Sequence, residues 1–163
     1  MLAAALLACA VNIAPVTLNA VVRVESGGDP LAIRVNHLSG PQPPHPATAA
    51  QAAALAELFI ARGYSVDLGL MQVNSRHLAA FGLTVQQALD PCTNIRAGDA
   101  VLTADYLAAA RAVGPGQRAL RLALAMYNAG SFRGGVANGY VGHYYRRGGV
   151  ANLAPLVIQA APK

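Results

Sequence analysis

The sequence predicts a mainly α-helical protein, built as a compact bundle of short helices. Alanine, the best helix former, makes up much of a composition that is 55% hydrophobic and only 12% charged. The alternation of β-branched and polar residues that is typical of strands is scarce, and glycine and proline punctuate the chain regularly. With 163 residues the chain is long enough for one sizeable core. We expect one domain over residues 1–147 and a loosely ordered tail over residues 148–163.

The chain begins with its longest apolar run, MLAAALLACAV. This run is far shorter than the roughly 20 residues needed to span a bilayer. It also lacks the positively charged start of a signal peptide. We expect it to form an early helix of the fold, with no membrane span, and we expect any export signal to lie outside this sequence.

Two helices are expected before residue 63. Thr17 is placed to cap a helix that runs through Glu25 and ends at the following glycines. Residues 29–46 are expected to form a loop, because prolines prevent regular structure from about residue 41 to 46. Thr48 and Gln51 have the three-residue spacing of a capping box and open a helix that stops near Gly63.

The second half of the chain is expected to contain further helices after an irregular or weakly extended stretch at residues 64–74. A short helix at residues 75–81 ends at Gly82, and Thr84 with Gln87 forms a second capping box. The remaining expected helices are a long one at residues 94–113, one from residue 117 into AMYNAG, and a short tyrosine-bearing one within residues 131–149.

The net charge of +5 favours an anionic partner such as nucleic acid, phospholipid or an acidic wall polymer. Eleven of the twelve cations are arginines, and only Arg146 and Arg147 are adjacent. Because the sequence shows no basic stripe with interleaved aromatic residues, we do not expect nucleic acid as a partner.

The chain contains two cysteines, Cys9 and Cys92, and no C-x-x-C pair. The four histidines lack metal-ligand spacing, so we expect neither a metal nor a cofactor. The cysteines are either two independent buried thiols or one disulfide that closes a loop of roughly 80 residues and contributes about 4 kcal/mol. We favour the disulfide, which requires an oxidising compartment.

Glu25 is the candidate catalytic residue. It continues, at helical spacing, the apolar face formed by Leu18, Val21 and Val22. Partial burial and the negative end of the helix dipole would both raise the pKa of its carboxyl group, as a general acid requires near neutrality. Taken alone, a glutamate here could equally pair with Arg23 or lie at the solvent edge of the stripe.

Three motifs follow one another in the sequence: ESGG from Glu25, GLMQVN at residues 69–74 and MYNAG at residues 126–130. Together with a later GYVGHYY, they resemble the lytic transglycosylase domain of the soluble lytic transglycosylase and goose-type lysozyme superfamily. The resemblance covers residues 9–145 and implies a lysozyme-like fold with a substrate cleft. The blocks around the two cysteines look in particular like small transglycosylases of type IV secretion and conjugation machines, and this supports a Cys9–Cys92 disulfide.

The resemblance implies cleavage of peptidoglycan glycan strands by a single glutamate, assisted by the N-acetyl group of the substrate. Glu25 would protonate the oxygen between N-acetylmuramic acid and N-acetylglucosamine, then accept the proton of the muramic 6-hydroxyl as a 1,6-anhydro end forms. The ordinary glycosidase pair of carboxylates has Asp67 as its best second member. Asp67 could instead bond its own loop, Asp29 fits a turn, and Asp99 and Asp105 fit a solvated helix face.

The resemblance also implies a set of substrate-binding residues. Ser26 would orient Glu25 or the substrate, Gly69 would allow close backbone approach, and Met71 and Gln72 would contact sugar. Each has a local alternative: Ser26 could bond at the helix end, Gly69 could be an ordinary turn glycine, and Met71 could be a core residue. Asn74 is a further candidate and could instead be only the cap of the next helix.

The last candidates lie near the C-terminus. Tyr127 fits core packing, whereas Asn128 would bind an N-acetyl group or hold the cleft loop. Tyr140 is the best match to the family tyrosine near the catalytic acid, with Tyr144 and Tyr145 as rivals.

The resemblance implies a periplasmic location, with peptidoglycan and type IV secretion components as partners. Two other functions stay open, a hydrolase of the same bond and a non-catalytic wall-binding assembly module. A nucleotide site at GPGQRA is not expected, because that motif follows a helix rather than a strand.

Overall fold

The computed structural model describes residues 1–129, 142 and 144. The chain forms two compact units: Glu25–Gly98 is one, and Met1–Val24 with Asp99–Lys163 is the other, called here the terminal unit. Seven α-helices and one three-stranded sheet lie within the described residues, which confirms the expected mainly α-helical class. The tail at residues 148–163 lies outside the described residues.

The Glu25–Gly98 unit is built on a small antiparallel sheet. Strands β1 (Ile33–Val35), β2 (Val66–Leu68) and β3 (Val73–Asn74) lie in that order, and Arg34 pairs with Asp67, which pairs with Asn74. The expected extended stretch at residues 64–74 is therefore confirmed, whereas β1 falls within a segment expected to be loop. β1 pairs with β2 along one edge, and the Gln42 side chain bonds its other edge, where it accepts from the Val35 amide at 2.8 Å and donates to the Val35 carbonyl at 2.9 Å.

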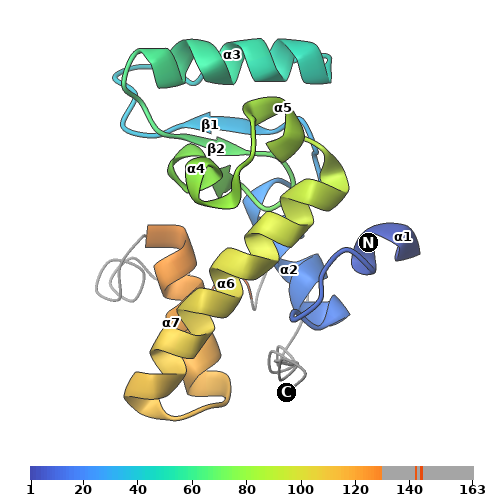
Figure 1. Ribbon diagram of the computed structural model, residues 1–163, viewed down its shortest axis with the longest axis vertical. Coiled ribbons are helices and arrows are strands. Elements are labelled where there is room, and N and C mark those ends of the chain that lie inside the picture. Colours follow the sequence, from blue (N-terminus) through green and yellow to red (C-terminus); the bar gives the residue numbers. More distant parts are fainter. Residues whose placement is uncertain (130–141, 143, 145–163) are drawn as a thin grey trace. The chain divides into compact units, whose positions relative to one another are not determined.

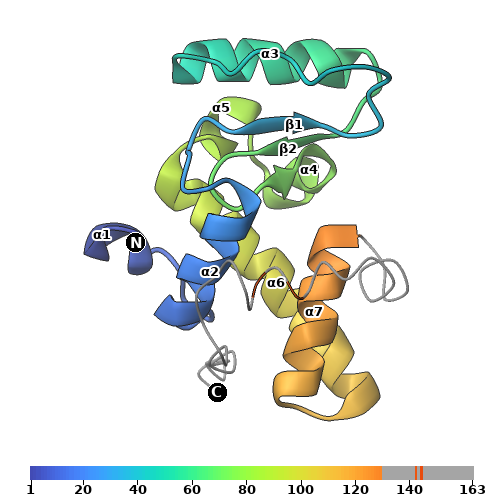
Figure 2. The same ribbon diagram turned by 180° about the vertical axis from the view of Figure 1, so that it is seen from behind.

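Helices surround this sheet within the same unit. Helix α3 (Ala49–Ala61) runs alongside β1 and β2 and also contacts the short helix α5 (Val85–Ala88) (Figures 1 and 2). The 3₁₀ helix η1 (Ser75–His77) leads directly into α4 (Leu78–Phe81). The alanines of α3 that face inward, Ala52, Ala53 and Ala56, are fully buried, because their small side chains let the helix approach closely.

The predicted caps are largely confirmed. At the start of α5, Thr84 Oγ1 accepts from the Gln87 amide at 3.2 Å, and Gln87 Oε1 accepts from the Thr84 amide at 2.9 Å. Thr48 caps α3 by accepting from the Gln51 amide at 3.2 Å. Gly82 ends α4 with a φ of 63°, in the left-handed region that glycine tolerates.

Two helices begin earlier than the capping residues predict. Helix α2 (Pro15–Glu25) starts two residues before Thr17, so the predicted cap at Thr17 is wrong, and Thr17 lies buried inside the helix. Helix α6 (Pro91–Val113) likewise starts at its proline rather than at Asn94. The fixed φ of proline and its missing amide hydrogen suit the first helical position, and this preference decides both starts. Helix α1 (Ala4–Leu7) is shorter than the apolar run suggested.

The core of the terminal unit combines stripes from three helices. The predicted apolar face of α2 is buried, and apolar side chains of α6 and α7 (Gln117–Ala129) are buried with it: Leu18, Val21, Val22, Leu102, Tyr106, Ala109, Leu120, Ala123 and Leu124. In the turn that joins α6 to α7, the Gly116 amide donates to the Tyr106 hydroxyl at 3.0 Å. That bond fixes where the chain reverses.

Asp99 is almost completely buried, with 3% of its surface exposed, so the expected solvated position is wrong. Its Oδ2 accepts from the amides of Val11 at 2.8 Å and Asn12 at 3.1 Å, and Thr103 Oγ1 donates to Oδ1 at 3.3 Å. A buried carboxylate needs such partners. Asp99 therefore anchors the segment that precedes α2 to α6 within the terminal unit.

Asp105, expected on the same solvated face, is half-buried instead. Burial raises the pKa of its carboxyl group to about 6.

Both cysteines are disulfide-bonded. They are the two cysteines of the chain, so the predicted Cys9–Cys92 bond is confirmed. Helices long and apolar enough to cross a bilayer are absent from the described part of the chain.

Reduction of the disulfide should lower the melting temperature by roughly 10 °C. A closed loop of roughly 80 residues contributes about 4 kcal/mol, and 1 kcal/mol shifts the melting temperature of a chain of this size by about 2–4 °C. Calorimetry with and without reductant measures the change. The Cys9→Ser/Cys92→Ser double variant is the control and should not respond to reductant. An unchanged wild-type melting temperature would contradict the bond.

Asp105→Asn should raise the melting temperature at pH 7.5, and the gain should disappear near pH 4. The pKa of Asp105 is higher in the folded chain than in the unfolded chain, so its ionisation costs stability as the pH rises from about 4 to about 6. Asp90→Asn is a control of opposite sign, because hydrogen bonds from Thr93 lower the pKa of Asp90. Thermal melts at the two pH values decide between these outcomes.

Candidate active site

Glu25 is the last residue of α2, and its side chain is half-buried. The next residues form a turn in which Gly27 and Gly28 have φ values of 68° and 92°. The C-terminal end of a helix carries partial negative charge, which disfavours ionisation of a carboxyl group placed there. Glu25 therefore occupies the helix position that the sequence predicts for it.

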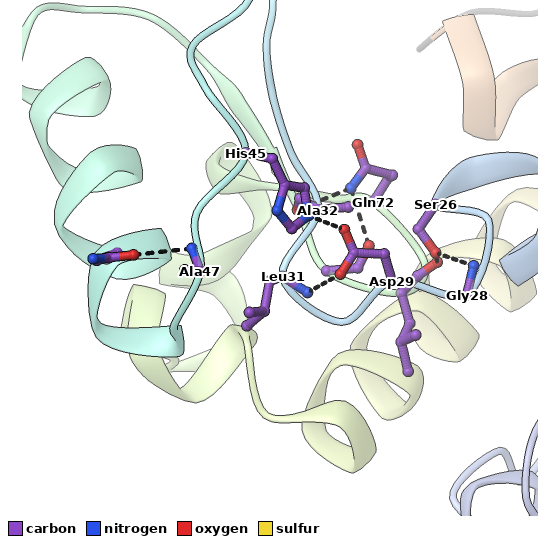
Figure 3. Close-up of polar contacts among 11 residues, drawn as sticks. Ser26, Gly28, Asp29, Leu31, Ala32, His45, Ala47 and Gln72 are labelled. Carbon is purple, nitrogen blue, oxygen red and sulfur yellow. Dashed lines mark hydrogen bonds and ion pairs between the residues drawn. The ribbon is translucent and has the colours of Figure 1, made fainter.

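Ser26 connects the end of α2 to a distant turn. Its hydroxyl donates to the Leu70 carbonyl at 2.7 Å and accepts from the Gly28 amide at 3.2 Å (Figure 3). The local bond that the sequence suggested is thus present, and a second bond spans 44 residues. Ser26, which directly follows Glu25, is therefore bonded to the backbone between β2 and β3.

The GLMQ turn, residues 69–72, joins β2 to β3 and is bonded on one side to Ala32, the residue before β1. The Gly69 amide donates to the Ala32 carbonyl at 2.8 Å. Gln72 Nε2 donates to the same carbonyl at 3.2 Å and to the Gly69 carbonyl at 3.0 Å (Figure 3). Gly69 has a φ of 67°, and Gln72 has a φ of 49°, which is uncommon for a residue other than glycine.

Asn94, in α6, holds the GLMQ turn from the other side and was missed by the sequence analysis. Its Oδ1 accepts from the Met71 amide at 2.8 Å, and its Nδ2 donates to the carbonyls of Leu68 at 2.8 Å and Ala88 at 2.7 Å. A side chain on Gly69 would place its Cβ 2.7 Å from Asn94 Nδ2. Gly69 is therefore packed against Asn94, and its predicted role in binding substrate stays a prediction. The sequence predicted Asn94 only as the first residue of the long helix, not as a contact of this turn.

Met71 is fully buried, with 0% of its surface exposed. Its side chain packs against Gly98 so closely that a Cβ there would lie 2.6 Å from the sulfur. Of the two interpretations open from the sequence, the structure therefore places Met71 as a core residue beneath the turn. A direct sugar contact by its side chain would require rearrangement of the turn.

Asp67 and Asn74 form a polar cluster on the sheet. Asp67 accepts from Asn74 Nδ2 at 2.6 Å and from Asn36 Nδ2 at 2.9 Å, and Asn74 Oδ1 accepts from the Arg76 amide at 3.1 Å. Burial raises the pKa of Asp67 above its usual value, although both amide bonds oppose the shift. Asn74 thus caps η1, the alternative left open for it, and Asp67 binds neighbouring side chains rather than its own loop's backbone.

Asp29 lies in the turn after Glu25 and has the structural role expected of it. Its Oδ1 accepts from the Leu31 amide at 2.9 Å, and its Oδ2 lies 2.5 Å from His45 Nε2 (Figure 3). His45 comes from the proline-rich segment. The pair joins that segment to the turn that follows α2.

The C-terminal candidates belong to the terminal unit. Tyr127 and Asn128 lie at the end of α7, and both are half-buried. Tyr144 is helical and fully buried. Tyr140 and Tyr145 lie outside the described residues, so the choice among the three tyrosines stays a prediction. Within the described part of the chain, no three His, Cys, Asp or Glu side chains are grouped so that they could hold a metal ion.

Comparison with known families matches residues 4–147 to the model named Transglycosylase SLT domain. The chain belongs to this family. The match includes Glu25, the GLMQ turn and Asn94, and it confirms the resemblance seen in the sequence motifs.

Curated relatives of this SLT domain share one name. Protein virB1 of Agrobacterium fabrum is 40% identical over 133 residues, which cover 82% of this chain and 53% of the relative. Type IV secretion system protein virB1 of Brucella abortus is 40% identical over 128 residues, or 78% of this chain and 53% of the relative. The chain thus spans about half the length of the curated relatives it matches. No solved structure matches the chain.

Gly69→Ala should destabilise the SLT domain by about 2–4 kcal/mol, because the new methyl group meets Asn94 and the backbone has a positive φ. Gly63→Ala is the matched control: its φ is 89°, but nothing lies within 4 Å of the added atom. That variant should lose only about 1 kcal/mol. Urea unfolding of both variants measures the difference, and equal losses would contradict the close approach.

Proposed function

We propose that this SLT domain is a peptidoglycan lytic transglycosylase. It cleaves the β-1,4 bond between N-acetylmuramic acid and N-acetylglucosamine, forms a 1,6-anhydromuramic end, and opens the wall locally for a type IV secretion or conjugation apparatus. The family match over residues 4–147 supports the reaction, and the name of the Brucella relative supports the setting. The Cys9–Cys92 disulfide supports an oxidising compartment, which in this setting is the periplasm.

The observation that carries the proposal is the position of Glu25. It ends α2, it is half-buried, and the next residue is bonded to the GLMQ turn. A general acid must keep its proton near neutrality, and the C-terminal end of a helix disfavours a negative charge. Asp67, the best candidate for a second carboxylate, is committed to Asn36 and Asn74. A mechanism with one carboxyl group therefore fits the Glu25–Gly98 unit.

In the proposed reaction, the Glu25 carboxyl group donates its proton to the glycosidic oxygen as the bond from that oxygen to C1 breaks. The N-acetyl group of the muramic residue assists at C1. The Glu25 carboxylate then accepts the proton of the 6-hydroxyl, whose oxygen bonds to C1 and closes the anhydro ring. The proton lost in the first step is regained in the second, and no water is consumed.

Substrate contacts are proposed for Ser26, Gln72, Asn74, Tyr127, Asn128 and Tyr140, with Gly69 and Met71 contributing through the turn that they shape. Gln72 has the strongest support from geometry. Two hydrogen bonds fix its Nε2, and its Oε1 has no partner among the described residues. That oxygen is a positioned acceptor for the N–H of an N-acetyl group.

Glu25→Gln should lower cleavage of purified sacculi by about 10²–10⁴-fold without changing the melting temperature, because a neutral isostere replaces a carboxyl group that is protonated for part of the cycle. Glu57→Gln is the matched control: Glu57 is exposed on α3, and its replacement should leave cleavage unchanged. Mass spectrometry of the wild-type digest should show products lighter by one water than hydrolysis products.

Two outcomes would redirect the proposal. Products with reducing ends would identify a hydrolase of the same bond. Equal residual activity of wild type and Glu25→Gln would identify a non-catalytic wall-binding module.

A further inference from the structure

Asn94 is a fully buried asparagine whose side-chain polar atoms all bond to backbone groups. Its side chain is 0% exposed. Both Nδ2 hydrogens are donated, to the carbonyls of Leu68 and Ala88, and Oδ1 accepts from the Met71 amide. The three bonds are 2.7–2.8 Å long, so the carboxamide has one favourable orientation.

These bonds fix the GLMQ turn at two points. Leu68 directly precedes the turn, and Met71 is its third residue. Leu70 lies between them, and its carbonyl accepts the hydroxyl of Ser26 at 2.7 Å. A shift of the backbone at either side of Leu70 would therefore move the acceptor that holds Ser26, the residue bonded covalently to Glu25.

Gly98 completes the fit one helical turn after Asn94. A Cβ at Gly98 would lie 2.6 Å from the Met71 sulfur and 2.7 Å from the Met71 Cβ. The same face of α6 thus bonds the backbone of the turn through Asn94 and makes room for its methionine at Gly98. Residues 69–72 are shaped against this face.

We propose that Asn94 is a positioning residue for the cleavage reaction, acting through the GLMQ turn and Ser26 on the orientation of Glu25. The proposal rests on the proposed function of Glu25 as acid and base. Asn94 touches neither substrate nor the reacting atoms. It sets the backbone to which Ser26 is anchored, and a misplacement of about 1 Å of a reacting group can lower the rate about 100-fold.

The test compares Asn94→Ala, Ser26→Ala and the double variant with the wild type, each assayed below its melting temperature. Asn94→Ala should lower kcat by about 100-fold and change KM by less than about threefold. Asn36→Ala is the matched control. It removes the same amide from the same unit, but its bond goes to Asp67, and its kcat should stay within about twofold of the wild type.

The double variant separates a positioning role from general destabilisation. If Asn94 acts through Ser26, the double variant should have nearly the kcat of the less active single variant, because both substitutions break the same chain of contacts. Fold-losses that multiply would overturn the proposal, as would a folded Asn94→Ala with wild-type kcat.

Two further measurements keep the proposal testable. If Asn94→Ala does not fold, Gly98→Ala displaces Met71 without removing a hydrogen bond and should lower kcat similarly; a wild-type kcat would overturn the proposal.

Hydrogen exchange at the Met71 amide should accelerate in Asn94→Ala and not in Asn36→Ala. This readout stands apart from activity: a wild type that cleaves no sacculi would refute the proposed function, whereas unchanged exchange in folded Asn94→Ala would refute the role of Asn94.

Discussion

The structure of the Glu25–Gly98 unit depends on a buried carboxamide, that of Asn94, which joins three backbone segments. Burial of an amide without partners costs several kcal/mol in an apolar environment, so the position is stable only when all its bonds are made. The partners are the end of β2, the GLMQ turn and the end of α5. Because each partner is a backbone group with a fixed direction, the three segments share one arrangement. Ser26 then joins the end of α2 to the same arrangement.

The sequence predicted those features of the fold that local contacts decide. The capping box of Thr84 involves partners three residues apart, and the structure contains both of its bonds. The helix starts at Pro15 and Pro91 were missed because a capping side chain and an N-terminal proline are competing local signals. The burial of Asp99 could not be predicted, since its partners Val11 and Asn12 lie 88 and 87 residues away. Helical periodicity assigns an acidic residue to solvent unless such a partner is known.

In the candidate site, too, the sequence predicted what local contacts decide and missed what distant contacts decide. The place of Glu25 at a helix end was predicted from its motif and the glycines that follow it, which are properties of the local sequence. The orientation of the GLMQ residues was not accessible in that way. Leu70 and Met71 are both buried, whereas Gln72, with a φ of 49°, is partly exposed, so the turn does not follow the alternation of an extended strand. A pattern of residue types cannot reveal a single left-handed residue, and it therefore left open whether Met71 faces sugar or the core.

The residues around the GLMQ turn are not those that would maximise local stability. Gln72 adopts a left-handed conformation that costs of order 1 kcal/mol for a residue other than glycine, and Gly98 in a helix costs about 1 kcal/mol relative to alanine. Each of these unfavourable local choices allows a specific contact. The conformation of Gln72 places its Nε2 on the carbonyls of Ala32 and Gly69, and Gly98 admits Met71. Elsewhere in the unit, at Thr48, Gly82 and Thr84, the local preferences agree with the fold. A left-handed residue other than glycine also occurs at His37 in this unit, with a φ of 57°. In the GLMQ turn, the conflict between local preference and fold indicates that the shape of the turn, more than its stability, is what its residues maintain.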